Sequence, residues 1–162
     1  MRLTSHMINL TTTMTKSIPP KNIVLYADDD TDDLMLVQDA FALFSPDVEV
    51  VTATDGIEAL SYLKNLSPFD PAPCLIILDI NMPRINGKET LRSIREMERY
   101  NQVPVVMFTT SSQPADKEFA RKYAAGFLTK PIDLEQMQFI TQQFVDHCTD
   151  EVKKNIRRLN GN

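Results

Sequence analysis

The sequence predicts an α/β protein with a doubly wound, five-stranded parallel sheet and helices on both faces. From Lys21 onward, short apolar runs alternate with helical patterns five times along the chain. Several of the apolar runs are nearly continuous, as in strands that are buried on both faces. Parallel strands need crossover connections, which are right-handed, and the helical segments supply them. Together these observations favour a sheet covered by helices on both sides.

The first half of the folded region contains two strands and two helices. Residues 22–27 (NIVLYA) read as a buried strand, and residues 48–53 (VEVVTA) as a second, more polar one. Residues 32–44 carry apolar side chains at helical spacing between them. Residues 55–66 form a helix, because an Asp at its start is followed three residues later by Glu, as in a capping box.

The middle of the chain continues the alternation after a loop. Three prolines mark residues 67–73 as that loop. Residues 74–79 (CLIILD) are the most apolar run in the chain and predict the central strand. An amphipathic helix at 86–100 and a strand at 103–110 follow.

The last third ends in a long helix. Residues 114–124 predict a helix and 126–130 a short strand. Residues 133–159 read as one long final helix with an apolar stripe, and its end beyond about residue 146 is expected to project from the body.

Length and composition limit the class of protein. A chain of 162 residues suits one domain with short tails. The net charge of −5 speaks against nucleic acid as a partner, because phosphate binding needs a basic surface. No apolar run approaches the roughly 18 residues of a membrane helix, so no membrane partner is expected.

The chain divides into three parts. Residues 1–20 are rich in Thr and Ser, lack a secretory apolar region and end in two prolines, so we interpret them as a disordered leader. Residues 21–146 form the folded domain, and residues 147–162 extend the last helix. Cys74 and Cys148 match no metal or redox spacing, so we expect reduced thiols in a cytoplasmic protein.

Polar side chains follow four of the predicted strands. In an open parallel sheet, ligands bind outside the carboxyl ends of the strands. Those ends carry Asp28, Asp29 and Asp30, then Asp79, then Thr109 and Thr110, and finally Lys130. The sequence therefore brings carboxylates, hydroxyls and an ammonium to one edge of the sheet.

This set of groups predicts a phosphoryl site with a divalent cation. Carboxylates held close together cannot all stay ionised without a cation, and Mg²⁺ prefers oxygen ligands. Asp29 and Asp79 are the expected direct ligands, with Asp28 acting through water and a backbone carbonyl just after Asp79 as a further ligand. The Lys130 ammonium and the Thr109 hydroxyl complete a pocket for a phosphoryl group. Asp79 ends the most buried strand and is the candidate nucleophile, forming an acyl phosphate.

Other interpretations of these residues are weaker. A calcium loop beginning at Asp28 needs Gly where Asp33 stands and Glu where Asp39 stands. A phosphatase of the haloacid-dehalogenase type needs a second Asp where Asn81 stands. Helix starts account for Asp32 and Asp33, since acidic side chains are favourable there.

The motifs YADDD, LIILDINMPRINGKE, PVVMFTT and GFLTKP closely resemble the receiver domain of two-component response regulators. The resemblance covers about residues 21–146 and implies a flavodoxin-like sheet with strand order 2-1-3-4-5. It also implies that a sensor histidine kinase, or a histidine phosphotransfer protein, donates a phosphoryl group to the chain.

Carried over by position, the resemblance assigns the site residues. Asp79 is the phosphoacceptor, and Asp28 and Asp29 hold Mg²⁺ together with Asp79 and the backbone carbonyl of Asn81. Thr109 is the switch hydroxyl, and Lys130 bonds to the phosphoryl group. The resemblance further implies that Phe127 is the switch aromatic, that Gly87 allows a tight turn, and that Lys130–Pro131 is a cis peptide.

The function expected from the sequence is that of a single-domain response regulator. It would act by binding a kinase, a phosphotransfer protein, another downstream protein or a second copy of itself as a homodimer. It is not expected to be an enzyme beyond catalysing its own phosphorylation and dephosphorylation. Two alternatives stay open: a constitutive protein-docking pseudo-receiver, and a small phosphatase that uses Asp79 as nucleophile.

Overall fold

The computed structural model of the protein describes residues 22–130, 133 and 135–160, and leaves the side chains of residues 157–160 undescribed. The predicted leader at residues 1–20 lies outside the described residues.

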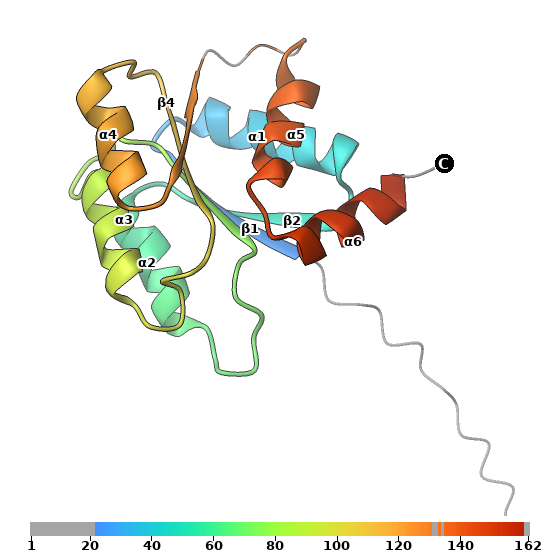
Figure 1. Cartoon of the computed structure of the whole chain (residues 1–162), viewed down its shortest axis with the longest axis horizontal. Helices are drawn as coiled ribbons and strands as arrows, with labels where there is room; N and C mark the ends of the chain where they lie inside the picture. The colour runs from blue at the N-terminus through green and yellow to red at the C-terminus, as the bar shows by residue number, and fades with distance from the viewer. Residues whose placement is uncertain (1–21, 131–132, 134, 161–162) are drawn as a thin grey trace, which may run out of the picture.

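Five strands form one parallel sheet in the order β2-β1-β3-β4-β5 (Figure 1). The strands are β1 (Asn22–Ala27), β2 (Val48–Ala53), β3 (Leu75–Leu78), β4 (Val105–Thr109) and β5 (Gly126–Thr129). Every residue of β3 is buried, as the continuous apolar run predicts for a central strand. The predicted fold class and strand order are confirmed.

Helices cover both faces of the sheet (Figure 1). The helices are α1 (Thr31–Phe44), α2 (Gly56–Asn65), α3 (Gly87–Glu96), α4 (Pro114–Lys122), α5 (Met137–Asp146) and α6 (Asp150–Asn160). One core cluster joins Val24 and Tyr26 of β1 to α1, α5 and α6, and the other joins Leu25 and Ala27 of β1 to α2, α3 and α4. Alternate residues of β1 therefore enter opposite cores, as a doubly wound sheet requires.

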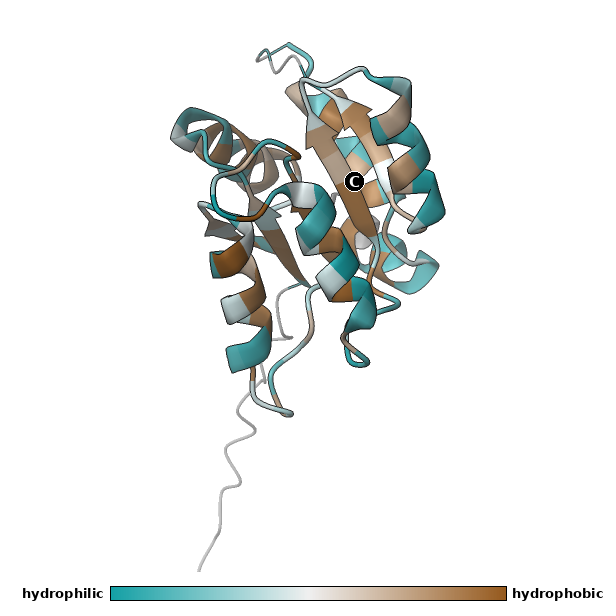
Figure 2. Ribbon diagram, turned by 90° about the vertical axis from the view of Figure 1, so that its left-hand side faces the viewer, coloured by the Kyte–Doolittle hydropathy of each residue, from teal (hydrophilic) through white to brown (hydrophobic). Residues whose placement is uncertain are grey.

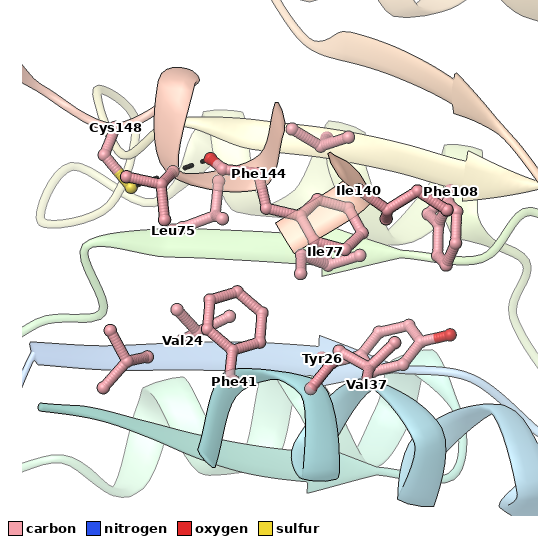
Figure 3. Packing of buried hydrophobic residues seen from close by; sticks show 14 of the residues in the cluster. Val24, Tyr26, Val37, Phe41, Leu75, Ile77, Phe108, Ile140, Phe144 and Cys148 are labelled. Carbon is pink, nitrogen blue, oxygen red and sulfur yellow. Dashed lines mark hydrogen bonds between the residues drawn. The ribbon is translucent and has the colours of Figure 1, made fainter. Parts of the chain in front are cut away.

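The hydrophobic side chains are concentrated between the layers. Figure 2 shows hydrophobic strands inside and hydrophilic colouring on the outward faces of the helices. We call the cluster that joins β1 to α1, α5 and α6 the α1–α5 core, and the one that joins β1 to α2, α3 and α4 the α2–α4 core. In the α1–α5 core, the Phe108 and Phe144 rings pack edge to face with centroids 5.1 Å apart (Figure 3). Each fully buried side chain of this size contributes roughly 1.5 to 3 kcal/mol through burial.

Polar residues at the strand–helix junctions start the helices. Asp30 caps α1 by accepting from the backbone N–H of Asp32 at 2.9 Å. Asp55 caps α2 as expected and accepts from the Glu58 N–H at 2.8 Å. The predicted capping box is incomplete, because the Glu58 carboxylate accepts from the N–H of Thr54 at 2.8 Å instead of from the N–H of Asp55.

The prediction of one final helix over residues 133–159 is wrong. The helix α5 ends at Asp146, and the N–H groups of His147 and Cys148 bond back to Phe144 and Val145 at 3.1 and 3.0 Å. A new helix, α6, then begins with two acidic residues in its first turn, which suits the positive end of the helix dipole.

The break between the helices has a packing reason. Figure 1 shows α6 turning away from the direction of α5 instead of continuing it. This turn buries Ile156, which is 2% exposed, in the α1–α5 core and packs Val152 against the same core. Residues 147–156 therefore pack against the body and do not project from it as expected, because a straight helix would carry these apolar side chains into water.

The docking of α6 can be tested with Ile156→Ala. We expect this variant to lose about 2 to 4 kcal/mol of unfolding free energy, because it leaves a cavity in a closed core. Lys154→Ala, at an exposed position of the same helix, should change stability by less than about 0.5 kcal/mol. Urea unfolding of both variants beside the wild type measures the difference, and equal stabilities would show that α6 does not dock.

Candidate functional site

The carboxyl ends of four strands bring the predicted site residues together. The sheet hydrogen bonds continue one residue past the strands: the Asp28 N–H bonds to Ala53 at 3.0 Å and the Asp79 N–H bonds to Ala27 at 2.9 Å. The Lys130 N–H likewise bonds to the Thr109 carbonyl at 2.8 Å. The backbones of Asp28, Asp79 and Lys130 are therefore fixed by the sheet itself.

Three carboxylates form an acidic cluster at this edge. Asp28, Asp29 and Asp79 each offer an oxygen atom, and these atoms all lie within 4.8 Å of one another. Asp28 is fully buried and Asp79 is 7% exposed, whereas Asp29 is exposed. The cluster thus has two buried members and one that faces solvent.

Lys130 is the ammonium group that faces the cluster. Its Nζ lies 2.6 Å from Asp28 Oδ2, 2.7 Å from Asp33 Oδ2 and 3.8 Å from Asp79 Oδ2. Burial works against its charge, but the hydrogen bonds to Asp28 and Asp33 outweigh that effect and raise the pKa of Lys130. The side chain is therefore a fixed positive charge beside Asp79.

The prediction that Asp33 serves only to start a helix is incomplete. Its N–H does bond to the cap residue Asp30, at 3.4 Å, as expected for a helix start. Its carboxylate, however, also holds Lys130. The position gives no clear sequence signal for this second role, because a contact over 97 residues depends on tertiary packing.

Tyr26 is a site residue that was not predicted from the sequence. Its hydroxyl donates to Asp28 Oδ2 at 2.5 Å, and the Asp30 N–H donates to Asp28 Oδ1 at 2.9 Å. Burial, together with the neighbouring Asp28 charge, raises the pKa of Tyr26, so the phenol remains a donor. The sequence did contain a signal for this contact, because Tyr26 and Asp28 are two residues apart and such residues of an extended strand point to the same face.

Asp79 is held in a buried and partly compensated environment. Its Oδ1 accepts from the Ile80 N–H at 2.8 Å, and the buried Thr109 stands at the end of the neighbouring strand β4. Burial raises its pKa to about 6, with Lys130 opposing the rise and the Asp28 charge adding to it. Ionised Asp79 therefore costs free energy unless further positive charge arrives.

Thr109 connects the acidic cluster to the start of α4. Its Oγ1 accepts from the Ser111 N–H at 3.2 Å, and the Ser111 hydroxyl donates to Asp116. Asp116 forms an ion pair with Lys88, and hydrogen bonds from Lys88 and Ser111 lower the pKa of Asp116. This network, which joins α3, the β4–α4 loop and α4, was not predicted from the sequence.

The loop after Asp79 closes over the strand end because residue 87 is glycine. A Cβ there would lie 2.0 Å from the Asp79 carbonyl oxygen. The Gly87 N–H bonds to the Ile80 carbonyl at 2.8 Å. The predicted role of Gly87 in a tight turn is thus supported by close approach of the backbone, which any larger residue would prevent.

Asn81 lies in this loop and is exposed. Within the part of the chain that the structure describes, no hydrogen-bond donor occupies its backbone carbonyl. That carbonyl is therefore available as a ligand. The Asn81 residue also lines an open pocket shared with Lys88, Ser111 and Asp116.

The remaining predicted residues lie next to the site. Phe127, in β5, is half-buried and packs against the α2–α4 core, with Lys117 Nζ 5.9 Å from its ring centroid. The predicted cis peptide Lys130–Pro131 cannot be compared, because Pro131 lies outside the described residues.

The chemistry of the donor set fits a hard divalent cation. Four carboxylates lie at one edge of the sheet, namely those of Asp28, Asp29, Asp33 and Asp79. Within the described structure, Lys130 provides the one ammonium group that bonds among them. These carboxylate oxygens, together with the backbone carbonyl of Asn81, are oxygen ligands of the kind that Mg²⁺ or Mn²⁺ prefers. Asp28, Asp29, Asp79 and the Asn81 carbonyl would hold such an ion.

The raised pKa of Asp79 predicts a stability change that depends on pH. In the folded protein its pKa is about 6, against an ordinary 3.8. The folded state therefore retains a proton that the unfolded state has lost between about pH 4 and pH 6, and stability falls as pH rises through this range. Asp79→Asn removes the penalty and should be more stable than the wild type at pH 7 in a chelating buffer, by on the order of 2 kcal/mol.

Urea unfolding at pH 4 and pH 7 measures this effect. The advantage of Asp79→Asn should shrink toward pH 4, where the carboxyl group is increasingly protonated in both states. Asp39→Asn, at an exposed position of α1, is the control and should show no comparable change. A constant difference across the pH range would contradict the assigned titration.

No helix in the described ranges is long and apolar enough to cross a membrane. Comparison with known proteins then places the chain in a family. Residues 24–142 match the family described as the response regulator receiver domain. Response regulator Rcp1 from Synechocystis is 34% identical over 103 residues, which cover 62% of this chain and 69% of Rcp1.

Two solved structures are similar as well. One is the phosphorylated cyanobacterial phytochrome response regulator RcpA, with a TM-score of 0.70, 29% identity, and coverage of 80% of this chain and 97% of RcpA. The other is the Mn²⁺-bound form of Rcp1, with a TM-score of 0.66, 29% identity, and coverage of 75% of this chain and 90% of Rcp1. With the family match over residues 24–142, these likenesses show that the chain belongs to the response regulator receiver domains of two-component signalling.

Proposed function

We propose that this receiver domain is a phosphorylation-dependent switch that accepts a phosphoryl group on Asp79. The observation that carries the proposal is the convergence on Asp79 of a buried ammonium, a buried hydroxyl and an acidic pair. Lys130 Nζ is 3.8 Å from Asp79 Oδ2, the buried Thr109 ends the strand next to β3, and Asp28 and Asp29 lie with Asp79 in the acidic cluster.

The proposed reaction moves a phosphoryl group from a phosphohistidine to Asp79. A carboxylate oxygen of Asp79 attacks the phosphorus atom, an oxygen–phosphorus bond forms, and the phosphorus–nitrogen bond breaks. The departing imidazole takes a proton from solvent. A divalent cation, when bound, neutralises charge on the transferring phosphoryl oxygens. Because the sheet fixes the backbone of Asp79, the nucleophile is already oriented for attack.

Lys130 and Thr109 would stabilise the product. Lys130 lies closer to Asp28 and Asp33 than to Asp79, so new negative charge on Asp79 gives its ammonium a further partner. The Thr109 hydroxyl would donate to a phosphoryl oxygen. Movement of Thr109 toward the phosphoryl group would disturb its present contact, in which its oxygen accepts from the Ser111 N–H.

We infer that this movement of Thr109 transmits the signal to α4. Ser111 is bonded to Asp116 in the first turn of α4, and Asp116 pairs with Lys88 of α3. A shift of Thr109 would therefore change the position of the β4–α4 loop relative to two helices. The half-buried Phe127 would move inward as the space near Thr109 opens. Phosphorylation would thus shift the population between two conformations of the surface near these residues.

The partners proposed for this chain follow from the family. A sensor histidine kinase or a histidine phosphotransfer protein would donate the phosphoryl group, and the altered surface around α4, β5 and α5 would bind a downstream protein or a second copy of the chain. Because the similar protein RcpA is a phytochrome response regulator, phytochrome-type kinases are one class of candidate donor. The proposal places this exchange in the cytoplasm.

We propose that the chain is not a turnover enzyme. A phosphatase that uses Asp79 needs a second carboxylate as acid and base at the position of Asn81, and that residue is an amide. A pseudo-receiver that only docks proteins is the other alternative. It would not need the acidic cluster, the buried Lys130 and the buried Thr109 together, and all of these are present.

Incubation with acetyl phosphate tests the proposed function. We expect the intact mass to rise by one phosphoryl group in the presence of Mg²⁺, and to stay unchanged in EDTA. Asp79→Asn should gain nothing, whereas Asp39→Asn should gain as much as the wild type, since Asp39 is an exposed residue of α1.

Two results would overturn the proposal. A mass that does not change under any Mg²⁺ concentration would favour the docking module. Continuous release of phosphate from several phosphate esters, abolished by Asp79→Asn, would favour the phosphatase.

A further inference from the structure

The two cysteines of the chain meet in the folded protein. They lie far apart in the sequence, whose spacing predicts independent thiols. In the structure Cys148 belongs to the core cluster that joins β1 to α1, α5 and α6, Cys74 packs against the same cluster, and each thiol influences the pKa of the other. Cys148 is buried, Cys74 is half-buried, and both belong to or pack against the α1–α5 core.

The backbone on each side of this contact is fixed. Cys74 directly precedes β3, and its N–H bonds to the Ile23 carbonyl at 2.8 Å. Cys148 lies in the turn between α5 and α6, where its N–H bonds to Val145 at 3.0 Å and its Sγ lies 3.9 Å from the Phe144 carbonyl oxygen. Figure 3 shows Cys148 at the Leu75 end of the core. Cys148 thus lies at the end of the core where Cys74 precedes Leu75, and the backbones of both cysteines are held in place by the fold.

The two thiols differ in their chemistry. Interaction with Cys148 lowers the pKa of Cys74, and the same interaction, together with burial, raises the pKa of Cys148. Since the thiolate is the nucleophile, Cys74 is the sulfur that reacts first, and it is also the one that solvent reaches.

We propose that Cys74 and Cys148 form a reversible intramolecular disulfide, a modification site at the sheet edge opposite Asp79. The oxidant is a small-molecule disulfide such as oxidised glutathione. The Cys74 thiolate attacks one of its sulfurs, the oxidant's S–S bond breaks, one thiolate leaves, and a mixed disulfide forms. Cys148 then loses its proton and attacks Cys74 Sγ, and the second thiol of the oxidant leaves. Two electrons and two protons pass from the protein to the oxidant.

Formation of the mixed disulfide prepares the second step. Cys74 no longer carries negative charge at that point, so the interaction that keeps the proton on Cys148 is lost. The resulting disulfide would tie the α5–α6 turn to the start of β3. This tie acts on the C-terminal helix and does not depend on phosphorylation of Asp79.

Equilibration of the full chain in glutathione buffers of increasing oxidised fraction tests the proposal. After acid quenching and alkylation under denaturing conditions, we expect a species that is two hydrogens lighter than the reduced protein and takes up no alkylating reagent. Trypsin should yield one cross-linked product that joins residues 65–84 to residues 123–153. The melting temperature of the oxidised form should exceed that of the reduced form by on the order of 5 to 10 °C.

Single serine variants are the controls. Cys148→Ser should accumulate the mixed disulfide on Cys74, and Cys74→Ser should remain largely unmodified, because its remaining thiol is buried and protonated. Cys74→Ala and Cys148→Ala replace either serine variant that fails to fold by circular dichroism. The proposal is overturned if the wild type keeps two alkylatable thiols in the most oxidising buffer, or carries only glutathione adducts or links between chains.

Discussion

Within the described structure, the Lys130 ammonium is shared by three carboxylates, those of Asp28, Asp33 and Asp79. Asp29 adds a fourth negative group to the same edge. One positive charge cannot balance four negative ones, and two of the carboxylates are almost fully buried. The site therefore stores unfavourable electrostatic energy, which a divalent cation would relieve. The phosphoryl transfer proposed for Asp79 depends on this imbalance between negative and positive charge. A phosphoryl group brings further negative charge into the same pocket, and that charge must be compensated.

The sheet is the device that holds the charges together. Backbone hydrogen bonds continue one residue past β1, β3 and β5, so Asp28, Asp79 and Lys130 are positioned by the sheet. The buried Tyr26 hydroxyl and the Asp30 N–H occupy both oxygens of Asp28. By contrast, the side-chain contacts that can change are those of Thr109, at the end of β4, and of Ser111 in the loop that follows it. Rigid carboxylates below a movable hydroxyl are the arrangement that a switch requires.

The sequence was sufficient for the parts of the fold that depend on local pattern. The strands at 22–27 and 48–53 have the predicted bounds, and the strand order follows from the family resemblance. Asp28, Asp29, Asp79, Thr109 and Lys130 were found because each stands at the carboxyl end of a strand or directly after it. The second roles of Tyr26 and Asp33 were not, since they depend on where side chains from distant elements point. The network of Lys88, Ser111 and Asp116 was missed for the same reason.

The C-terminal segment shows where local pattern fails. The apolar stripe of residues 133–159 has one helical period, yet burial of Ile156 outweighs the continuity of a single helix. Thr149, Asp150 and Glu151 were the available sign of a new helix start. The contact between Cys74 and Cys148 likewise appears only once β3 and the α5–α6 turn are brought together.

Calorimetric titration of Mg²⁺ into the wild type and Lys130→Met tests the charge imbalance most directly. We predict that the wild type binds one Mg²⁺, and that Lys130→Met binds it more tightly by about tenfold or more, because the competing ammonium is gone. Asp29→Asn should bind more weakly, as the loss of a ligand requires. Absence of Mg²⁺ binding to the wild type, or equal or weaker binding by Lys130→Met, would contradict the claim that this edge is short of positive charge.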